Sequence, residues 1–203
     1  MAGKRSYTVP ILYLALTIMA ILLVLSYSKQ LLTQQELTLK DGKRLASQYD
    51  YALIFADRLH DGAELLLQGN SSADMLKAAV RVGEADAVKA EAGGIFAAAL
   101  DRGGSSADGE SPHDRIEAAL AALFDESGGA AIGLAEQEAP YSADQIERLQ
   151  AVKDASAAMR EALSRFRPPT VDAGYRSMAA GVDWVDAAAS AAQSLLSLAS
   201  ELR

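Results

Sequence analysis

The sequence contains no cysteine. This absence excludes a disulfide framework, a thiolate metal site, a cysteine nucleophile and lipid attachment through cysteine. Aromatic residues make up only 6% of the chain, and the alternating patterns typical of β-strands are missing. Few aromatics combined with heavy use of alanine favour closely packed helices over a β-sandwich or barrel. We therefore predict an all-α protein with a thin core lined by alanine.

Clustered positive charge is also lacking. The 203 residues carry a formal net charge of -8 at pH 7. Because Lys4 and Arg5 lie at the N-terminal tip, the rest of the chain is more acidic than the whole. Binding to nucleic acid requires clustered cations that neutralise phosphates. The composition therefore predicts a protein without a nucleic-acid partner.

Recognisable catalytic motifs are missing as well, including a nucleophile elbow and a complete phosphate-binding loop. The best candidate for a metal site lies on one side of a predicted helix, where Asp57, His60, Asp61 and Glu64 come together. A di-metal site in a bundle needs further ligands from other helices, and the helix phase turns these side chains away from the apolar seam. We interpret them as a solvated charged face, and we expect no enzyme activity, cofactor or metal.

One run of the chain is long, apolar and free of charge. Residues 8–27 read TVPILYLALTIMAILLVLSY. About 20 helical residues, each rising about 1.5 Å, cover roughly the 30 Å of a bilayer's hydrocarbon core. Tyr7 and Tyr27 lie at its ends, where phenol rings favour the membrane interface. We predict a transmembrane signal anchor over residues 7–28 that contacts membrane lipid.

The charges beside this run bear on its orientation. Lys4 and Arg5 precede it closely, as in an uncleaved signal anchor, and long domains cross a membrane largely regardless of charge. We therefore expect residues 1–6 to form a short cytoplasmic tail, with the body on the extracytoplasmic side of a bacterial plasma membrane. The larger number of Lys and Arg residues that follow the run favours the opposite orientation, which stays open.

The same run could instead be a cleaved signal peptide. Ser26-Tyr27-Ser28 places small residues at the spacing that cleavage needs. However, the apolar segment is longer than the roughly 7 to 15 residues typical of a signal-peptide core. This length favours an anchor that is retained.

Beyond the run, residues 29–44 are mostly polar with scattered leucines, and we predict a helical stalk there. Residues 45–203 carry apolar positions in alternating steps of three and four, the spacing of a helix that packs against a partner helix. The four long seams are Leu45, Tyr49, Ala52, Ala56, Leu59, Ala63 and Leu66; Leu76, Val80, Gly83, Ala87, Ala90, Gly94 and Ala97; Leu149, Val152, Ser156, Met159, Leu163 and Phe166; and Val171, Tyr175, Met178, Val182, Val185, Ala189, Ala192, Leu196 and Ala199.

Turn and cap signals separate these seams. Gly69-Asn70 is predicted to end the first helix, and Pro168-Pro169 to end the helix that starts near the capping pair Ser142 and Gln145. A short helix begins at Pro112 and ends at Ser127-Gly128-Gly129, with Ile116, Leu120 and Leu123 or Phe124 on its apolar side.

Four apolar stripes require partners, so we predict an antiparallel bundle of four long helices plus one short helix. The long helices should run out, back, out and back, with the short helix in the connection between the second and third. The last one, continuous from Thr170 almost to Arg203, should return toward the membrane. Its Leu195, Leu198 and Leu202 would then pack on the stalk leucines.

Two features are candidates for contact with a partner. Arg160, Arg165 and Arg167 cluster near a helix C-terminus, where the helix dipole favours cations and where an acidic partner could bind. Trp184 falls beside the last seam. Packing in the core is the preferred interpretation of Trp184, and an exposed anchor for a partner is the alternative.

Anchor, stalk and bundle suggest an envelope scaffold or adaptor that binds another envelope protein or a second copy of itself. The alternative is a ligand-sensing bundle, because the layout resembles the extracytoplasmic four-helix modules of bacterial chemoreceptors. That resemblance is architectural, without a shared motif, and this sequence shows no second span or signalling domain. A polar pocket among the seams would favour sensing. A filled core with an exposed apolar strip would favour the adaptor.

Overall fold

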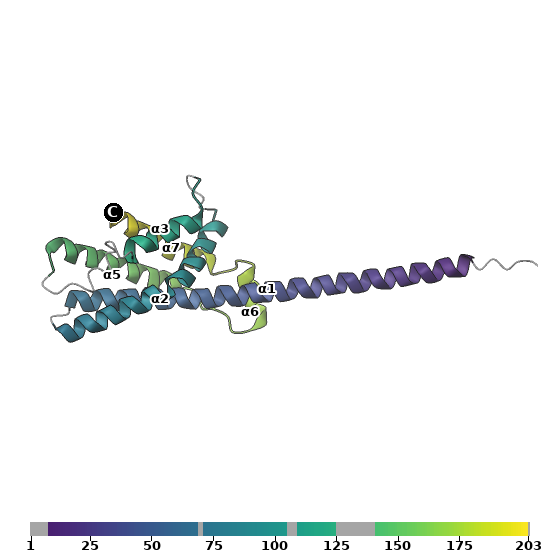
Figure 1. The fold of residues 1–203 in the computed structure, drawn as a ribbon, viewed down its shortest axis with the longest axis horizontal. Coiled ribbons are helices and arrows are strands. Elements are labelled where there is room, and N and C mark those ends of the chain that lie inside the picture. Colours follow the sequence, from purple (N-terminus) through teal and green to yellow (C-terminus); the bar gives the residue numbers. More distant parts are fainter. Residues whose placement is uncertain (1–7, 69–70, 105–108, 125–140, 203) are drawn as a thin grey trace, which may run out of the picture.

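The computed structural model describes residues 8–68, 71–104, 109–124 and 141–202, and these ranges form helices without any strand (Figure 1). The predicted all-α class is confirmed. The tail of residues 1–6 and the predicted helix ends at Gly69-Asn70 and Ser127 to Gly129 lie outside the described residues. The helices are α1 (Thr8–Gln68), α2 (Ser72–Arg102), α3 (Pro112–Phe124), α5 (Ala143–Ser164), α6 (Asp172–Ala179) and α7 (Val185–Glu201).

Helix α1 has 61 residues and no break, so the predicted stalk and first bundle helix are one element. At about 1.5 Å per residue it is about 90 Å long. Side chains from Leu12 to Thr38 are all exposed, and burial begins at Gly42 and Leu45. Figure 1 shows this exposed part projecting from the bundle as a single rod. Its apolar part is long and hydrophobic enough to cross a membrane, by length and composition.

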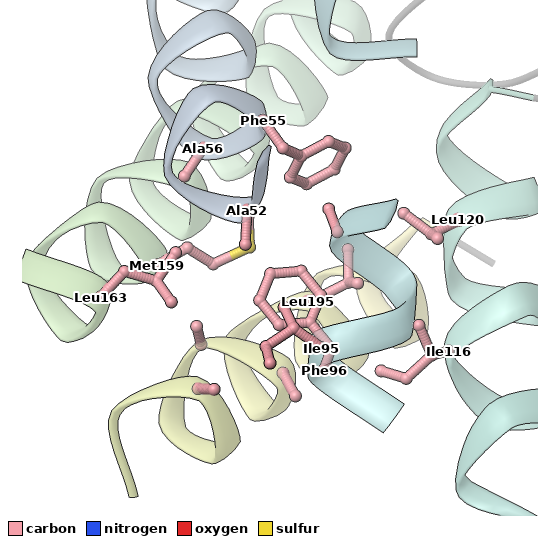
Figure 2. Packing of buried hydrophobic residues seen from close by; sticks show 14 of the residues in the cluster. Ala52, Phe55, Ala56, Ile95, Phe96, Ile116, Leu120, Met159, Leu163 and Leu195 are labelled. Atoms are coloured by element: carbon pink, nitrogen blue, oxygen red, sulfur yellow. The ribbon is translucent and has the colours of Figure 1, made fainter. Parts of the chain in front are cut away.

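All six described helices bring apolar side chains into one core, part of which is drawn in Figure 2. At its centre Phe55 of α1 packs near Phe96 of α2 and Phe124 of α3, with ring centroids 6.4 and 6.0 Å away. Alanines such as Ala52 and Ala188 fill the space between the larger side chains and are fully buried. The core is therefore lined by many alanines, as the composition predicts.

The seams predicted for the first long helix and for α5 are confirmed. All seven positions from Leu45 to Leu66 are buried, as are the α5 positions from Leu149 to Leu163. Phe166, just beyond α5, is half-buried and packs edge-on against Tyr49, with ring centroids 5.1 Å apart.

The seam predicted for α2 has the wrong phase over most of its length, and only its last residue, Ala97, is buried in the core. Val82, Ala85 and Phe96 face the core, whereas Leu76 and Val80 of the predicted seam are 68% and 52% exposed. Helix α2 carries two apolar stripes, and a spacing of three and four residues describes each of them equally well. The stripe with the larger aromatic and aliphatic side chains near Phe96 is the buried one.

The predicted final helix is in fact two helices. Helix α6 ends in a Schellman motif: Val182 N–H donates to the Ser177 carbonyl at 3.2 Å, and Gly181 N–H donates to the Met178 carbonyl at 3.0 Å. Gly181 has φ +83°, a conformation that favours glycine, and Asp183 follows with φ +68°. The chain therefore turns between α6 and α7.

This turn changes the direction of the C-terminal helix. Figure 1 shows α7 running away from the projecting rod. Leu195 and Leu198 are buried in the core, so the prediction that the last helix returns to the stalk leucines was wrong.

The order of helix directions also differs from the simple alternation. We call the end of the bundle near Gly42 the base and the end near Gln68 the tip. Helix α5 runs from tip to base, because Lys153 pairs with Glu64 and the Leu163 carbonyl lies near the base, where it accepts from the Tyr49 hydroxyl at 2.7 Å. Helices α2 and α5 therefore point the same way. The short α3 lies between them in sequence and packs against α2 and α7 rather than forming only a connection.

At the base, α6 packs directly on α1 through Gly42. A Cβ atom added at residue 42 would overlap the backbone carbonyl of Tyr175. Lys43 adds an ion pair to Asp172 at 3.6 Å, exposed to solvent, and lies over the Tyr175 ring. Only glycine allows the two backbones to approach this closely.

We predict that Gly42→Ala destabilises the protein by about 1 to 3 kcal/mol, because the α6 backbone must move to relieve the overlap. The matched control is Gly83→Ala in α2, where nothing lies within 4 Å of the added Cβ. That control should gain about 0.5 to 1 kcal/mol from the better helix propensity of alanine. Urea unfolding followed by circular dichroism measures both. Equal stability of the two variants would contradict the close contact.

Candidate interaction surface

Trp184 is fully buried and lies at the corner between α6 and α7. Its indole N–H donates to the Met178 carbonyl at 2.8 Å, and the Arg102 guanidinium lies 5.2 Å from the ring centre. Arg102 also donates to the same carbonyl at 3.4 Å. The residue therefore fixes the corner to the end of α2, in agreement with core packing. It does not form an exposed anchor in this structure.

The three arginines are placed differently from one another. Arg160 reaches Asp57 of α1 at 3.7 Å, while Arg165 pairs with Glu161 one turn earlier at 3.3 Å. Arg167 is exposed beyond the end of α5. Two of the three are therefore engaged in separate ion pairs, one of them between helices.

The interpretation of this side of α1 as a solvated face holds for the carboxylates Asp57, Asp61 and Glu64, which are 51%, 42% and 40% exposed, and is wrong for His60. His60 is only 9% exposed, and its Nδ1 lies 3.2 Å from the Lys153 carbonyl. Glu64 accepts from the Lys153 ammonium at 3.1 Å. Helix α1 packs against both α2 and α5, so a side chain beside the apolar seam meets a second neighbour instead of water. Asp57, His60 and Glu64 form the edge of the α1–α5 interface.

The interior of the bundle contains few polar side chains. Aromatic residues aside, the buried polar side chains among the described residues are His60 and Ser156. The Ser156 hydroxyl donates to the Lys153 carbonyl at 2.8 Å, the same carbonyl that lies beside His60. Within the described part of the chain, no group of three or more histidine or acidic side chains is placed to hold a metal ion.

The most distinctive surface is the outer stripe of α2, which we define as Leu76, Val80, Gly83, Ala87 and Ala90. All five residues are exposed, and they follow one another in steps of four and three. The stripe extends over about 21 Å of helix. Its residues have the spacing of a seam between two helices, yet no helix of the described chain covers the stripe.

A groove adjoins each end of the stripe. The tip groove lies between α2 and α1, has a volume of about 600 Å³, and is lined by Leu76, Val80 and Leu65 together with charged side chains. The second groove lies between α2 and α3, has a volume of about 350 Å³, and includes Ala90 and the apolar Ile116 of α3. The stripe is thus continuous with hollowed surface on the α1 side at one end and the α3 side at the other.

Charged residues flank the stripe, and most are already paired. Glu84 accepts from Arg58 of α1 at 3.0 Å and from Arg81 at 2.9 Å, and Asp86 pairs with Lys89. Glu91 is exposed beside Ala90. Glu117, which lines the α2–α3 groove, is 74% exposed and has only a 3.9 Å contact with the His113 imidazole. The negative charge that is least compensated therefore lies at the α3 end of the stripe.

Comparisons of the chain with protein-family models, with curated proteins and with solved structures found no match. The residues of the stripe were visible in the sequence as a seam, but they were assigned to the core.

The ion pair between Glu64 and Lys153 leads to a prediction of how the stability of the protein depends on pH. The hydrogen bond from the Lys153 ammonium, followed by its charge, lowers the pKa of Glu64. A lowered pKa in the folded state stabilises the protein above the pKa of the unfolded chain, about 4.3 for glutamate. This contribution is lost as the pH falls through the lower folded pKa. Glu64→Gln should therefore lower the urea midpoint at pH 7, and the difference from the unmodified chain should shrink below about pH 4.

The control for this experiment is Glu91→Gln, which changes an exposed glutamate on α2. Its midpoint should follow that of the unmodified chain at both pH values. A difference between Glu64→Gln and the unmodified chain that is constant from pH 7 to pH 3 would contradict the stabilising ion pair.

Proposed function

We propose that this protein is a membrane-anchored adaptor of a bacterial envelope, which binds a partner protein through the outer stripe of α2 and carries out no catalysis. The main support for this proposal is the exposed stripe itself. Leu76 and Val80 are large apolar side chains that remain more than half exposed although the core beneath them is filled. Contiguous exposed apolar surface of this kind is typical of sites where proteins bind one another.

The filled interior supports the adaptor over the ligand-sensing alternative. A sensing bundle needs a pocket with polar groups among its helices. Here the core positions of α1, α2 and α5 are filled by apolar side chains, and His60 and Ser156 both lie against one backbone carbonyl. The two grooves beside the stripe lie on the surface and adjoin the apolar positions that a partner would cover.

Helix α1 supports the anchoring role. The sequence from Leu12 to Asp41 contains neither glycine nor proline, and the helix enters the bundle without a break. From Lys29 to Gly42 the helix rises about 20 Å. An apolar run in the bilayer would therefore hold the bundle at a fixed height. The charges Lys4 and Arg5 before the run favour the extracytoplasmic side for the bundle.

Site-specific crosslinking in intact cells tests this function. A photoreactive residue replaces Lys77, which is exposed and lines the tip groove, in the full-length chain. We expect it to capture one other envelope protein, and Val80→Asp should reduce that capture at least about tenfold by placing a charge in the apolar contact.

The matched control is Val171→Asp. Val171 is 63% exposed and lies outside the stripe, before α6, so the same chemical change should leave capture intact. Surface substitutions of this kind alter stability by only about 0.5 kcal/mol. Capture that survives Val80→Asp, or that is lost equally in both variants, would contradict the proposal. Capture of only the chain itself would also overturn the adaptor role.

A further inference from the structure

We infer that the outer stripe of α2 binds a single amphipathic helix of the partner, which crosses α2 over Gly83 and carries basic side chains at its end above Ala90. This inference rests on the proposed adaptor function and adds the chemistry of the partner. The steps of four and three along the stripe fit a helix. The stripe is on a helix surface, whose backbone groups are already paired, so a β-strand could not be added to it.

The middle of the stripe is shaped for close approach. Gly83 has no side chain, and nothing lies within 4 Å of the position that a Cβ would take. Ala87 and Ala90 follow it on the same face and are exposed. Small residues at the crossing point bring helix axes toward the short end of the usual range of about 8 to 10 Å.

The two grooves define how the partner crosses. Near Leu76 and Val80 the hollow lies on the α1 side of α2, whereas near Ala90 it lies on the α3 side. A helix whose larger side chains enter both grooves must pass obliquely over Gly83. Ridges that pack into grooves at an oblique angle are the common arrangement of helices in globular proteins.

The charges assign a polarity to the partner. Arg58, Arg81 and Lys89 are already paired with Glu84 and Asp86. At the α3 end, Glu91 and Glu117 are exposed to solvent. Lysine or arginine on the partner above this end would complement them, whereas acidic side chains there would be repelled.

A second copy of the chain fits this surface less well. Two copies anchored in one membrane and related by a twofold axis along its normal would bring their α2 helices together in parallel. In a parallel seam on this stripe, Asp86 occupies the position that faces Glu91 of the other copy. Like charges would meet on both sides, so a partner with basic flanks is the better occupant.

Two synthetic helical peptides test the inference. Both carry the same seam of leucine and alanine; one has lysine and the other glutamate at the flanking positions. Binding to the full-length chain in nanodiscs of neutral phosphatidylcholine is measured by fluorescence anisotropy. We expect the lysine peptide to bind at least about tenfold more tightly than the glutamate peptide, with an affinity that falls as salt rises. Glu91→Gln combined with Glu117→Gln should reduce this preference.

The variant Gly83→Leu distinguishes a partner helix that crosses over Gly83 from nonspecific binding to an apolar patch. The side chain has free space in the monomer and adds apolar surface, so a nonspecific apolar patch would bind the lysine peptide more tightly. If the peptide crosses over Gly83, Gly83→Leu should instead weaken its binding by about tenfold or more, and Gly83→Ala should weaken it less. Retained or stronger binding by Gly83→Leu, or equal binding of the two peptides, would overturn the inference.

If the inference failed but the crosslinking from Lys77 still depended on Val80, the adaptor function would stand without the helical partner. If only the peptide bound and no Val80-dependent capture occurred, the adaptor function would fall.

Discussion

The bundle depends on how the surface of α1 is divided among its neighbours. From Gly42 to Leu66 this helix contacts α2, α5 and α6, and each contact uses a different kind of side chain. Phe55 and Gly62 face α2, and Gly42 admits the backbone of α6. Toward α5, the apolar seam is bordered by Asp57, His60 and Glu64. One helix can support three neighbours in this way because small side chains keep the backbones close and leave room around its circumference.

Much of the fold could be predicted from periodicity alone. The seams of α1 and α5 were recoverable because each of these helices buries one dominant stripe, with large residues such as Tyr49 or Leu163 in phase with smaller ones. Gly181 was the available signal for the break between α6 and α7. The seam spacing continued through it from Met178 to Val185, and a continuous period concealed the turn. Periodicity reports which residues share a face and carries no information on whether a glycine within that face ends the helix.

The sequence identified the residues of the candidate surface as a seam, but it did not show that this seam lies on the outside of the bundle. Leu76, Val80 and Gly83 were identified as a seam, but α2 has a second stripe through Val82 and Phe96, and only tertiary contacts decide which of two stripes is buried. His60 illustrates the opposite case. A polar residue beside a seam is expected in water, yet α5 covers it because α1 is surrounded on more than one side. Trp184 lies next to a seam in sequence and is buried because the chain turns there.

The unbroken course of α1 also has a mechanical consequence. A helix that lacks both glycine and proline from Leu12 to Asp41 has no hinge at which bending would concentrate. With its apolar run in a bilayer, any reorientation of that run would swing the whole bundle as one lever. Helices commonly tilt by about 20° to match bilayer thickness, and over the roughly 60 Å from Lys29 to Gln68 such a tilt displaces the far end sideways by about 20 Å. Local membrane thickness would thereby set which neighbours the outer face of α2 can reach.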